Sequence, residues 1–260
     1  MDLGLAGKRA IVCASSQGLG RACAVALAEA GASVVLNGRD AAALAATADA
    51  IRAATGVAVA TVAGDVAEDA TQVALVAAAD GVPDILVNNN AGPPLKDFRA
   101  LDAAALHAGL DANMVTPIRM TQRVIDGMAE RGFGRIVCIT SAAVKAPTAG
   151  LDLSSGARLG LTGFLAGVAR SVVGKGVTIN FLLPGLFATR RLEGVHAFAA
   201  KAQGVSAEEA ATRARARIPA GRFGDPDEFG RACAFLCSAH AGFITGQSLL
   251  IDGGAYAGVL

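Results

Sequence analysis

A short apolar run, a glycine-rich turn and a helix follow one another near the start of the chain, and they constrain its fold most. Residues 10–14 are predicted to form a strand and residues 21–30 a helix. Gly18 and Gly20 in the turn carry no Cβ, so a diphosphate and a neighbouring strand can approach the backbone there. Amide groups and the dipole at the start of the helix favour an anion. The stretch therefore predicts a phosphate-binding turn, with an ordinary strand–helix turn as the alternative.

Composition points to one core and argues against several classes of protein. The chain has 260 residues without a Pro/Ser-rich linker or charge block, so residues 1–260 are predicted to form a single domain. The net charge of +1 gives no electrostatic reason to expect nucleic-acid binding. No stretch has the continuous apolar character of a membrane helix, and none resembles a signal peptide. We therefore expect a cytoplasmic protein that binds neither nucleic acid nor membrane.

The cysteines are odd in number and form no Cys-x-x-Cys pair, so a disulfide framework is not expected. Buried small hydrophobic residues in a reducing compartment are the predicted state of Cys13, Cys23, Cys138, Cys233 and Cys237. No spacing of His, Cys and carboxylate residues predicts a metal site.

Apolar strands alternate with alanine-rich helices along the rest of the chain. Strands are predicted at residues 33–37, 57–63, 84–88, 134–140, 177–183 and 247–252. Helices are predicted at residues 40–54, 68–79, 102–131, 154–174 and 225–238, with a bend in the longest of them at Pro117. Uniformly apolar strands belong in a sheet covered on both faces, and the alternation gives parallel strands. The predicted fold is an α/β three-layer Rossmann fold with a doubly wound, parallel, seven-stranded sheet.

Motifs at the predicted strand ends resemble those of the short-chain dehydrogenase/reductase family over nearly the whole chain. Residues 13–20 resemble its TGxxxGxG turn, residues 65–66 its Asp-Val pair, residues 89–92 its NNAG segment, and residues 184–189 its PG…T segment. Residues 244–254 match its C-terminal signature. The resemblance implies a nicotinamide-dinucleotide site formed by Ala14, Ser16, Gln17, Gly18, Leu19, Gly20, Asp65, Val66, Asn89, Asn90, Ala91, Gly92, Arg158, Pro184, Gly185 and Thr189.

The chain departs from the family pattern at two places in this cofactor site. Ala14 stands where the family has its first turn glycine. One additional asparagine in the run at residues 88–90 leaves two registers open for the loop over the ribose.

The end of the second predicted strand bears on the choice of dinucleotide. NAD enzymes of this fold place a carboxylate there to accept a hydrogen bond from the ribose 2′-hydroxyl. This chain has Gly38 and Arg39 instead, and a guanidinium can bind a 2′-phosphate. We therefore predict NADP(H) over NAD(H). The alternative is that Arg39 is a solvated turn residue paired with Asp40.

The resemblance implies Asn113 and Ser141 as active-site residues and places a Tyr-x-x-x-Lys pair thirteen residues after the serine. That count reaches Ser154 and, four residues later, Arg158. A hydroxyl from each serine would bind one substrate carbonyl while Arg158 stabilises the oxyanion, with water as the proton source. The alternative is that Ser154 only begins a helix. Other candidate proton donors are Tyr256, Lys145, Asp152 and His196.

The leading prediction for function is an NADP(H)-dependent oxidoreductase that interconverts a carbonyl and an alcohol. The resemblance is greatest to 3-oxoacyl-(acyl-carrier-protein) reductases, and it implies a substrate lid, here at about residues 186–218, and a homotetramer or dimer. Ser206 and Glu209 in the lid have the spacing of a capping box. Binding of acyl carrier protein or CoA by the lid arginines is a minor alternative to a solvated helix. A dinucleotide-binding sensor or assembly partner without turnover, and a reductase of imines, remain open as alternatives.

Overall fold

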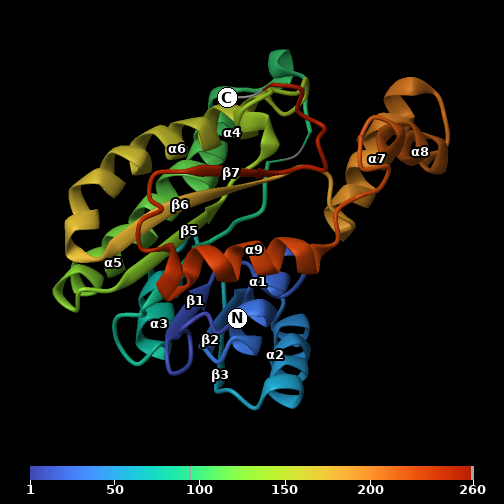
Figure 1. Cartoon of the computed structure of the whole chain (residues 1–260). Coiled ribbons are helices and arrows are strands. Elements are labelled where there is room, and N and C mark those ends of the chain that lie inside the picture. Colours follow the sequence, from blue (N-terminus) through green and yellow to red (C-terminus); the bar gives the residue numbers. More distant parts are fainter. Residues whose placement is uncertain (94, 259–260) are drawn as a thin grey trace.

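Seven parallel strands form one sheet in the order β3-β2-β1-β4-β5-β6-β7, which confirms the predicted fold class (Figure 1). The computed structural model describes residues 1–93 and 95–258, with every side chain in those ranges except that of Ala202. The strands are β1 (Arg9–Val12), β2 (Ser33–Gly38), β3 (Val59–Ala63), β4 (Ile85–Asn88), β5 (Gly134–Ile139), β6 (Val177–Pro184) and β7 (Ser248–Ile251).

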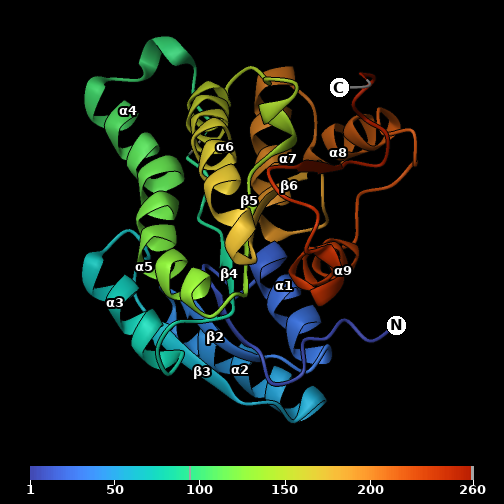
Figure 2. The same cartoon turned by 60° about the vertical axis from the view of Figure 1, so that its left-hand side comes forward.

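Helices cover both faces of the sheet, and each layer buries its own apolar cluster (Figure 2). One layer holds α1 (Gly18–Glu29), α2 (Ala41–Thr55) and α9 (Pro226–Cys237). The other layer holds α3 (Asp69–Ala78), α4 (Ala103–Leu110), α5 (Thr116–Glu130) and α6 (Asp152–Val172). Because successive strand side chains point to opposite faces, the uniformly buried β4 and β5 supply both clusters. No helix of the described chain has the length and apolar character needed to cross a bilayer.

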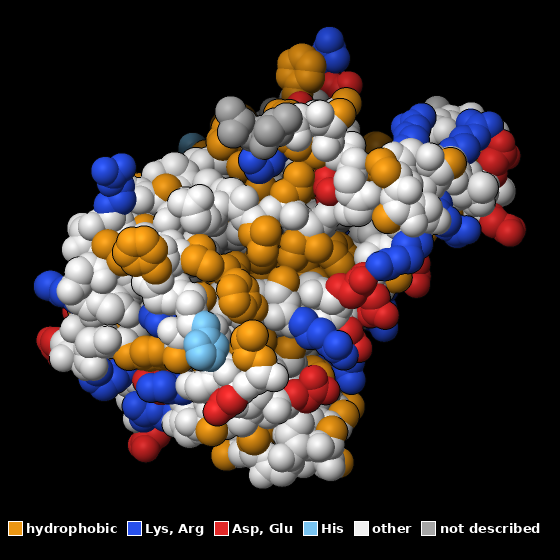
Figure 3. All heavy atoms as spheres, in the orientation of Figure 1, with side chains coloured by type: hydrophobic (Ala, Val, Ile, Leu, Met, Phe, Trp, Pro, Cys, Tyr) orange, Lys and Arg blue, Asp and Glu red, His pale blue; other side chains and the backbone are white. Residues whose placement is uncertain are grey.

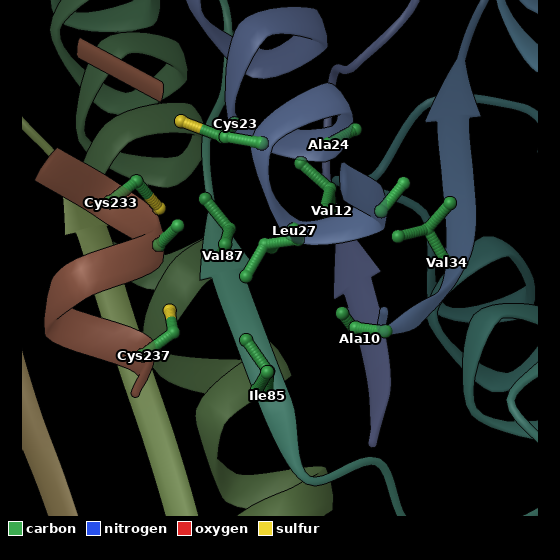
Figure 4. Close-up of a cluster of buried hydrophobic side chains, with 14 of the residues drawn as sticks. Ala10, Val12, Cys23, Ala24, Leu27, Val34, Ile85, Val87, Cys233 and Cys237 are labelled. Atoms are coloured by element: carbon green, nitrogen blue, oxygen red, sulfur yellow. The ribbon is translucent and has the colours of Figure 1, made fainter. Parts of the chain in front are cut away.

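The helices α1 and α9 pack closely although they lie at opposite ends of the sequence. A Cβ on Gly230 would lie 2.3 Å from the backbone oxygen of Ala22, so only glycine permits this approach. Cys23, Cys233 and Cys237 lie in the same interface, as Figure 4 shows. Hydrogen bonding to Cys23, and burial, hold the pKa of Cys233 well above its ordinary value, so the thiol stays protonated. All five cysteines are free and buried, which confirms their predicted role in packing.

The long helix predicted at residues 102–131 is interrupted by a π-helical turn at Asp111–Val115, between α4 and α5. The prediction placed a bend at Pro117, which is instead accommodated in the first turn of α5. A proline ring clashes with the carbonyl four residues earlier, here that of Asn113, and a wider turn relieves the clash. The irregularity therefore lies one turn earlier than predicted and centres on Asn113.

Helix α1 begins at Gly18, three residues before the predicted start, because the glycines themselves form its first turn. The prediction was drawn from apolar spacing, which begins only at Ala22. The backbone amides of Gly18 to Gly20 thus lie in the first turn of the helix, where amides have no hydrogen-bond partner within the helix itself.

The chain after β6 forms two helices, α7 (Arg190–Gln203) and α8 (Ala207–Ala216), which stand out from the body in Figure 1. The hydroxyl of Ser206 accepts from the amide of Glu209 at 3.1 Å and caps α8 as predicted. The Glu209 carboxylate binds Arg213 at 2.5 Å. The predicted capping box is therefore only half formed among the described residues. The reciprocal box appears at Asp225 and Glu228, at the start of α9.

Candidate active site

The glycine turn packs so closely on the loop after β4 that its shape excludes side chains. A Cβ on Gly20 would lie 2.3 Å from the backbone oxygen of Ala14 and 2.8 Å from Nδ2 of Asn89. Gly18 adopts φ +59° and lies against Thr189, the residue that precedes α7. Ala14, where the family has glycine, also adopts a positive φ of +44°. The turn can therefore present bare backbone amide groups to an anion.

The end of β2 carries a free cation beside this turn. Arg39 is exposed and makes no hydrogen bond or ion pair among residues 1–93 and 95–258. Asp40, the partner offered by the alternative interpretation, instead caps α2 by accepting from the amides of Ala42 and Ala43. The guanidinium of Arg39 is thus available to a ligand at the carboxyl end of β2.

The three asparagines at residues 88–90 point in three directions. Asn88 is buried and donates to the backbone oxygen of Pro117 at 3.3 Å and to the hydroxyl of Thr121 at 3.0 Å. Asn89 donates to the backbone oxygen of Ala14 at 3.0 Å, in the glycine turn. Asn90 donates to the backbone oxygen at position 112, in the π turn, at 3.0 Å. The additional asparagine thus belongs to the core, and the next two tie the loop to its neighbours.

A cavity lies at the carboxyl ends of the central strands, where the predicted cofactor and catalytic residues meet. Its lining includes Val66, Asn89, Asn90, Asn113 and Arg158. The buried Thr116 hydroxyl at this cavity has no hydrogen-bond partner among the described residues. An orphaned buried hydroxyl is costly unless a ligand or water completes it, so this lining suits a polar ligand.

Ser154 and Arg158 lie one turn apart on α6, and the Arg158 guanidinium donates a hydrogen bond to the Ser154 hydroxyl. Ser154 is only 3% exposed. The helix packs against the short turn that Ser141 begins, where the Ser141 hydroxyl accepts from the amide of Ala143 at 3.1 Å. Each serine oxygen thus already accepts a hydrogen bond, and each hydroxyl proton remains free to be donated.

Two arginines come together beside Gly92, in the loop after β4. A Cβ on Gly92 would lie 2.7 Å from Nη2 of Arg191 and 3.3 Å from Nη1 of Arg158. Burial, and secondly the positive charge of Arg191, lower the pKa of Arg158 to about 10, which leaves the guanidinium charged at neutral pH. Arg191 was not among the site residues predicted from the sequence. The twin arginines directly after Thr189 were the available signal.

The segment after β6 lies next to the end of β7. The amide of Gly185 donates to the backbone oxygen of Ile251 at 2.8 Å, and a Cβ on Gly185 would lie 2.7 Å from Cβ of Asp252. Thr189, four residues later, lies against Gly18 of the glycine turn. Asp65 follows β3, which lies at the opposite edge of the sheet from β7. Its carboxylate accepts a hydrogen bond from the amide of Ala67 at 3.0 Å and shapes the turn after β3.

Comparison with known proteins places this geometry in a family. The family described as enoyl-(acyl carrier protein) reductase matches residues 13–256. Acetoacetyl-CoA reductase from Cupriavidus necator is 35% identical over 198 residues, covering 75% of this chain and 76% of that protein. The chain belongs to the short-chain dehydrogenase/reductase family. It is accordingly an oxidoreductase that uses a nicotinamide dinucleotide.

Two further relatives match over almost their whole length. The 3-oxoacyl-(acyl-carrier-protein) reductase FabG of Vibrio harveyi is 32% identical over 260 residues, covering 98% of this chain and 99% of that protein. The structure of L-sorbose reductase from Gluconobacter frateurii, complexed with NADPH and L-sorbose, superposes with a TM-score of 0.93. That chain is 27% identical, and all of both chains is covered. These two matches therefore run along at least 98% of this chain.

The four other candidate proton donors predicted from the sequence lie in different surroundings. Nζ of Lys145 lies 5.9 Å from the centre of the Tyr256 ring, so these two candidates are neighbours. His196 packs against Phe223 in the lid, and burial, with a smaller effect of Arg215, lowers its pKa. The Asp152 carboxylate accepts from the amide of Gly150, in the turn before α6. These four side chains do not belong to the cavity lining that contains Asn113 and Arg158, and neither do Ser141 and Ser154.

Proposed function

We propose that the protein is an NADP(H)-dependent reductase that interconverts a carbonyl compound and its alcohol with a proton donor other than tyrosine. Ser154 and Arg158 occupy the positions of the family's Tyr-x-x-x-Lys pair by count from Ser141. The observation that carries the proposal is the hydrogen bond from Arg158 to the Ser154 hydroxyl beside the asparagine-lined cavity. A cation bound to a hydroxyl oxygen makes the hydroxyl a better hydrogen-bond donor.

In this proposal each side chain has a separate role at the substrate oxygen. The bound nicotinamide supplies the hydride to the carbonyl carbon. Ser141 and Ser154 donate hydrogen bonds to the carbonyl oxygen, and Arg158 stabilises the negative charge that develops there. Asn113 in the π turn lines the cavity. A water molecule supplies the proton, because neither a serine hydroxyl nor a charged guanidinium is a strong acid.

The cofactor proposal rests on the fit of the chain to a dinucleotide. The glycine turn leaves a space that a Cβ would fill, as a diphosphate requires. Arg39 supports NADP(H) over NAD(H), because it is exposed, unpaired among the described residues and placed at the end of β2. Its guanidinium would bind the 2′-phosphate by charge-assisted hydrogen bonds.

The relatives suggest which substrates to test first. Acetoacetyl-CoA and 3-oxoacyl carrier-protein reductases are among them, so a 3-oxoacyl thioester is the first class. We place the substrate lid at residues 186–218, which include α7 and α8. Binding of acyl carrier protein or CoA by the lid arginines receives little support, because Arg213 is bound to Glu209 and Arg215 lies over the ring of Phe223.

We also propose that the chain assembles into a homotetramer. Apolar side chains gather on the face that carries β7 and α9 in Figure 3. Phe235 in α9, Leu249 in β7 and Phe243 in the chain between them are exposed. Leu159 and Phe164 on α6 are 54% and 49% exposed. Exposed apolar patches of this kind mark protein interfaces, and two such faces are what a tetramer with dihedral symmetry requires. Light scattering coupled to gel filtration measures the assembly.

The test of the reaction is NADPH oxidation by the purified protein with ketones, 3-oxoacyl thioesters and cyclic imines. We expect turnover with carbonyl substrates and a lower rate with NADH. Tight NADPH binding without turnover on any of the three classes would contradict the proposal and favour a sensor. Turnover of imines alone would contradict the assignment to carbonyl compounds.

A further inference from the structure

The two arginines beside Gly92 form a pair of like charges that the protein itself does not neutralise. Arg158 comes from α6, in the body of the protein, and Arg191 from the first turn of α7. Their guanidinium groups approach the same backbone position, Gly92. Arg158 is half-buried and Arg191 is exposed, and two like charges held this close destabilise each other unless a negative group joins them.

The described contacts of the pair include no negative group. Arg191 donates to the backbone oxygens of Gly92 at 3.3 Å and Pro93 at 3.2 Å. Arg158 donates to Ser154. Among residues 1–93 and 95–258, no carboxylate forms an ion pair with either guanidinium. Both arginines therefore keep donor capacity and positive charge for a ligand.

We infer that Arg158 and Arg191 form a subsite for an anionic group of the substrate, so that the enzyme reduces carbonyl compounds that carry a carboxylate. Two guanidinium groups bind a carboxylate with several charge-assisted hydrogen bonds. Arg191 is then a specificity-determining residue of the lid. The inference rests on the proposed reductase function and narrows its substrate class, because a thioester carries no charge close to its reacting carbonyl.

The position of the pair assigns the anion to the substrate rather than to the diphosphate of the cofactor. The diphosphate turn follows β1 and faces Thr189. The arginine pair lies one strand further along the sheet, at the loop after β4 and on the side of β5. Ser141 follows β5, and Ser154 shares a helix with Arg158. A carboxylate held by the arginine pair and the carbonyl bound by the two serines would thus belong to the same substrate molecule.

The experiment compares matched oxo acids and their methyl esters. The probes are 2-oxobutanoate, acetoacetate and 4-oxopentanoate with the corresponding esters, assayed with NADPH in a chloride-free buffer of low ionic strength. We expect kcat/KM for the best acid to exceed that of its ester by about tenfold or more, as a charge-assisted pair provides. Added salt should reduce this advantage. Equal or higher kcat/KM for all three esters would overturn the inference.

The variants separate the substrate subsite from the cofactor site. Arg191→Gln should lower kcat/KM for the acid by about 10-fold to 100-fold and leave that of the ester and the NADPH affinity unchanged. Arg191→Lys should restore part of the loss. Arg190→Gln is the matched control, because Arg190 is the exposed neighbour on the same helix and, among the described residues, forms no hydrogen bond with the loop at Gly92. If Arg191→Gln weakens NADPH as much as the acid, the anion is the diphosphate and the inference is wrong.

A binding measurement distinguishes failure of the subsite from failure of the reductase. Calorimetry measures binding of the three hydroxy acids, the reaction products, to the protein saturated with NADP⁺. If the acids bind and Arg191→Gln abolishes binding, the subsite is supported even when no carbonyl compound turns over. If carbonyl compounds turn over but neither acid binding nor the acid preference depends on Arg191, the reductase function stands and the subsite does not.

Discussion

Two parts of the site are built by different means: the glycine turn, which we call the cofactor edge, and the start of α6, which we call the proton-donor edge because the family pattern has its tyrosine there. At the cofactor edge the shape is set by backbone: a Cβ on Gly20 would lie 2.3 Å from a carbonyl oxygen. At the proton-donor edge the chemistry is set by side chains, with Arg158 bound to Ser154 and next to Arg191. Backbone shape leaves few alternatives to glycine, whereas side-chain chemistry can change while the helix that carries it stays. Under the proposed assignment of Ser154 and Arg158, this difference explains how a chain can keep the family's fold with other side chains at the positions of its catalytic pair.

The strongest test of the cofactor edge is Gly20→Ala. We expect NADPH binding to fall below detection and the free energy of unfolding to fall by about 1–3 kcal/mol, because the added methyl overlaps backbone atoms. Calorimetry and urea unfolding measure the two effects. Gly167→Ala is the control, since a Cβ there meets nothing within 4 Å in the middle of α6. That variant should gain about 0.5–1 kcal/mol. NADPH binding by folded Gly20→Ala at wild-type affinity would remove the contrast between the two edges.

The corresponding test of the proton-donor edge is Ser154→Ala. We expect kcat to fall by about 100-fold with little change in NADPH affinity, because the variant removes one hydrogen bond to the substrate oxygen. Ser155→Ala is the matched control. Its hydroxyl is also buried, but it donates to the backbone oxygen of Leu151 at 2.9 Å. Equal losses of kcat in the two variants would show that position 154 acts only through the helix.

Arg39→Ala tests whether the cofactor edge also contains selective side-chain chemistry. We expect NADPH affinity to fall by about 30-fold and NADH affinity to stay the same, because one charge-assisted contact to the 2′-phosphate is lost. Fluorescence titration of the reduced cofactors measures both. Arg170→Ala, at the exposed end of α6, controls for the change in net charge. An equal loss of NADH affinity and NADPH affinity would show that Arg39 does not bind the 2′-phosphate.

The pH dependence of kcat sharpens the comparison, because only the proton-donor edge contains a guanidinium with a lowered pKa. Arg158 is charged below its pKa of about 10 and neutral above it. We expect kcat to be level from pH 7 to 9 and to fall as the pH rises through about 10, approaching tenfold per unit above it. Stopped-flow measurement in buffers of constant ionic strength follows this decline. A level profile up to pH 11 would show that the charge of Arg158 is not needed.

The smallest effect is expected from Ala14→Gly, which restores the family's residue at the cofactor edge. Ala14 has a positive φ, which costs an alanine about 1 kcal/mol, but glycine loses more backbone entropy on folding. We therefore expect a gain of only about 0.5 kcal/mol in unfolding free energy and a change in NADPH affinity of less than about threefold. Thermal unfolding with and without NADPH measures both quantities. A loss of stability would show that the alanine methyl is needed for packing.

The fold was predictable because its signals are local and repeated. The apolar strands and the glycine turn predict the parallel sheet, and the structure differs mainly in boundaries, as at Gly18. The π turn was harder to place, because a proline signals an irregularity without fixing which turn absorbs it.

The site was only partly predictable, since two of its features depend on contacts between distant segments. Gly92 and Arg191 are far apart in sequence, so no periodicity or motif could bring them together. The direction of Asn88 into the core likewise depends on Thr121 in α5. The roles assigned to Ser141, Ser154 and Arg158 stay predictions.

The packing of α1 against α9 has a consequence for how the chain matures during synthesis. The helix that begins at the glycine turn rests on residues 226–237, and Gly230 is the point of closest approach. A nascent chain still on the ribosome lacks that support until residues 226–237 have emerged from the exit tunnel. The glycine turn therefore gains its packed support only after α9 has been synthesised, long after the turn itself.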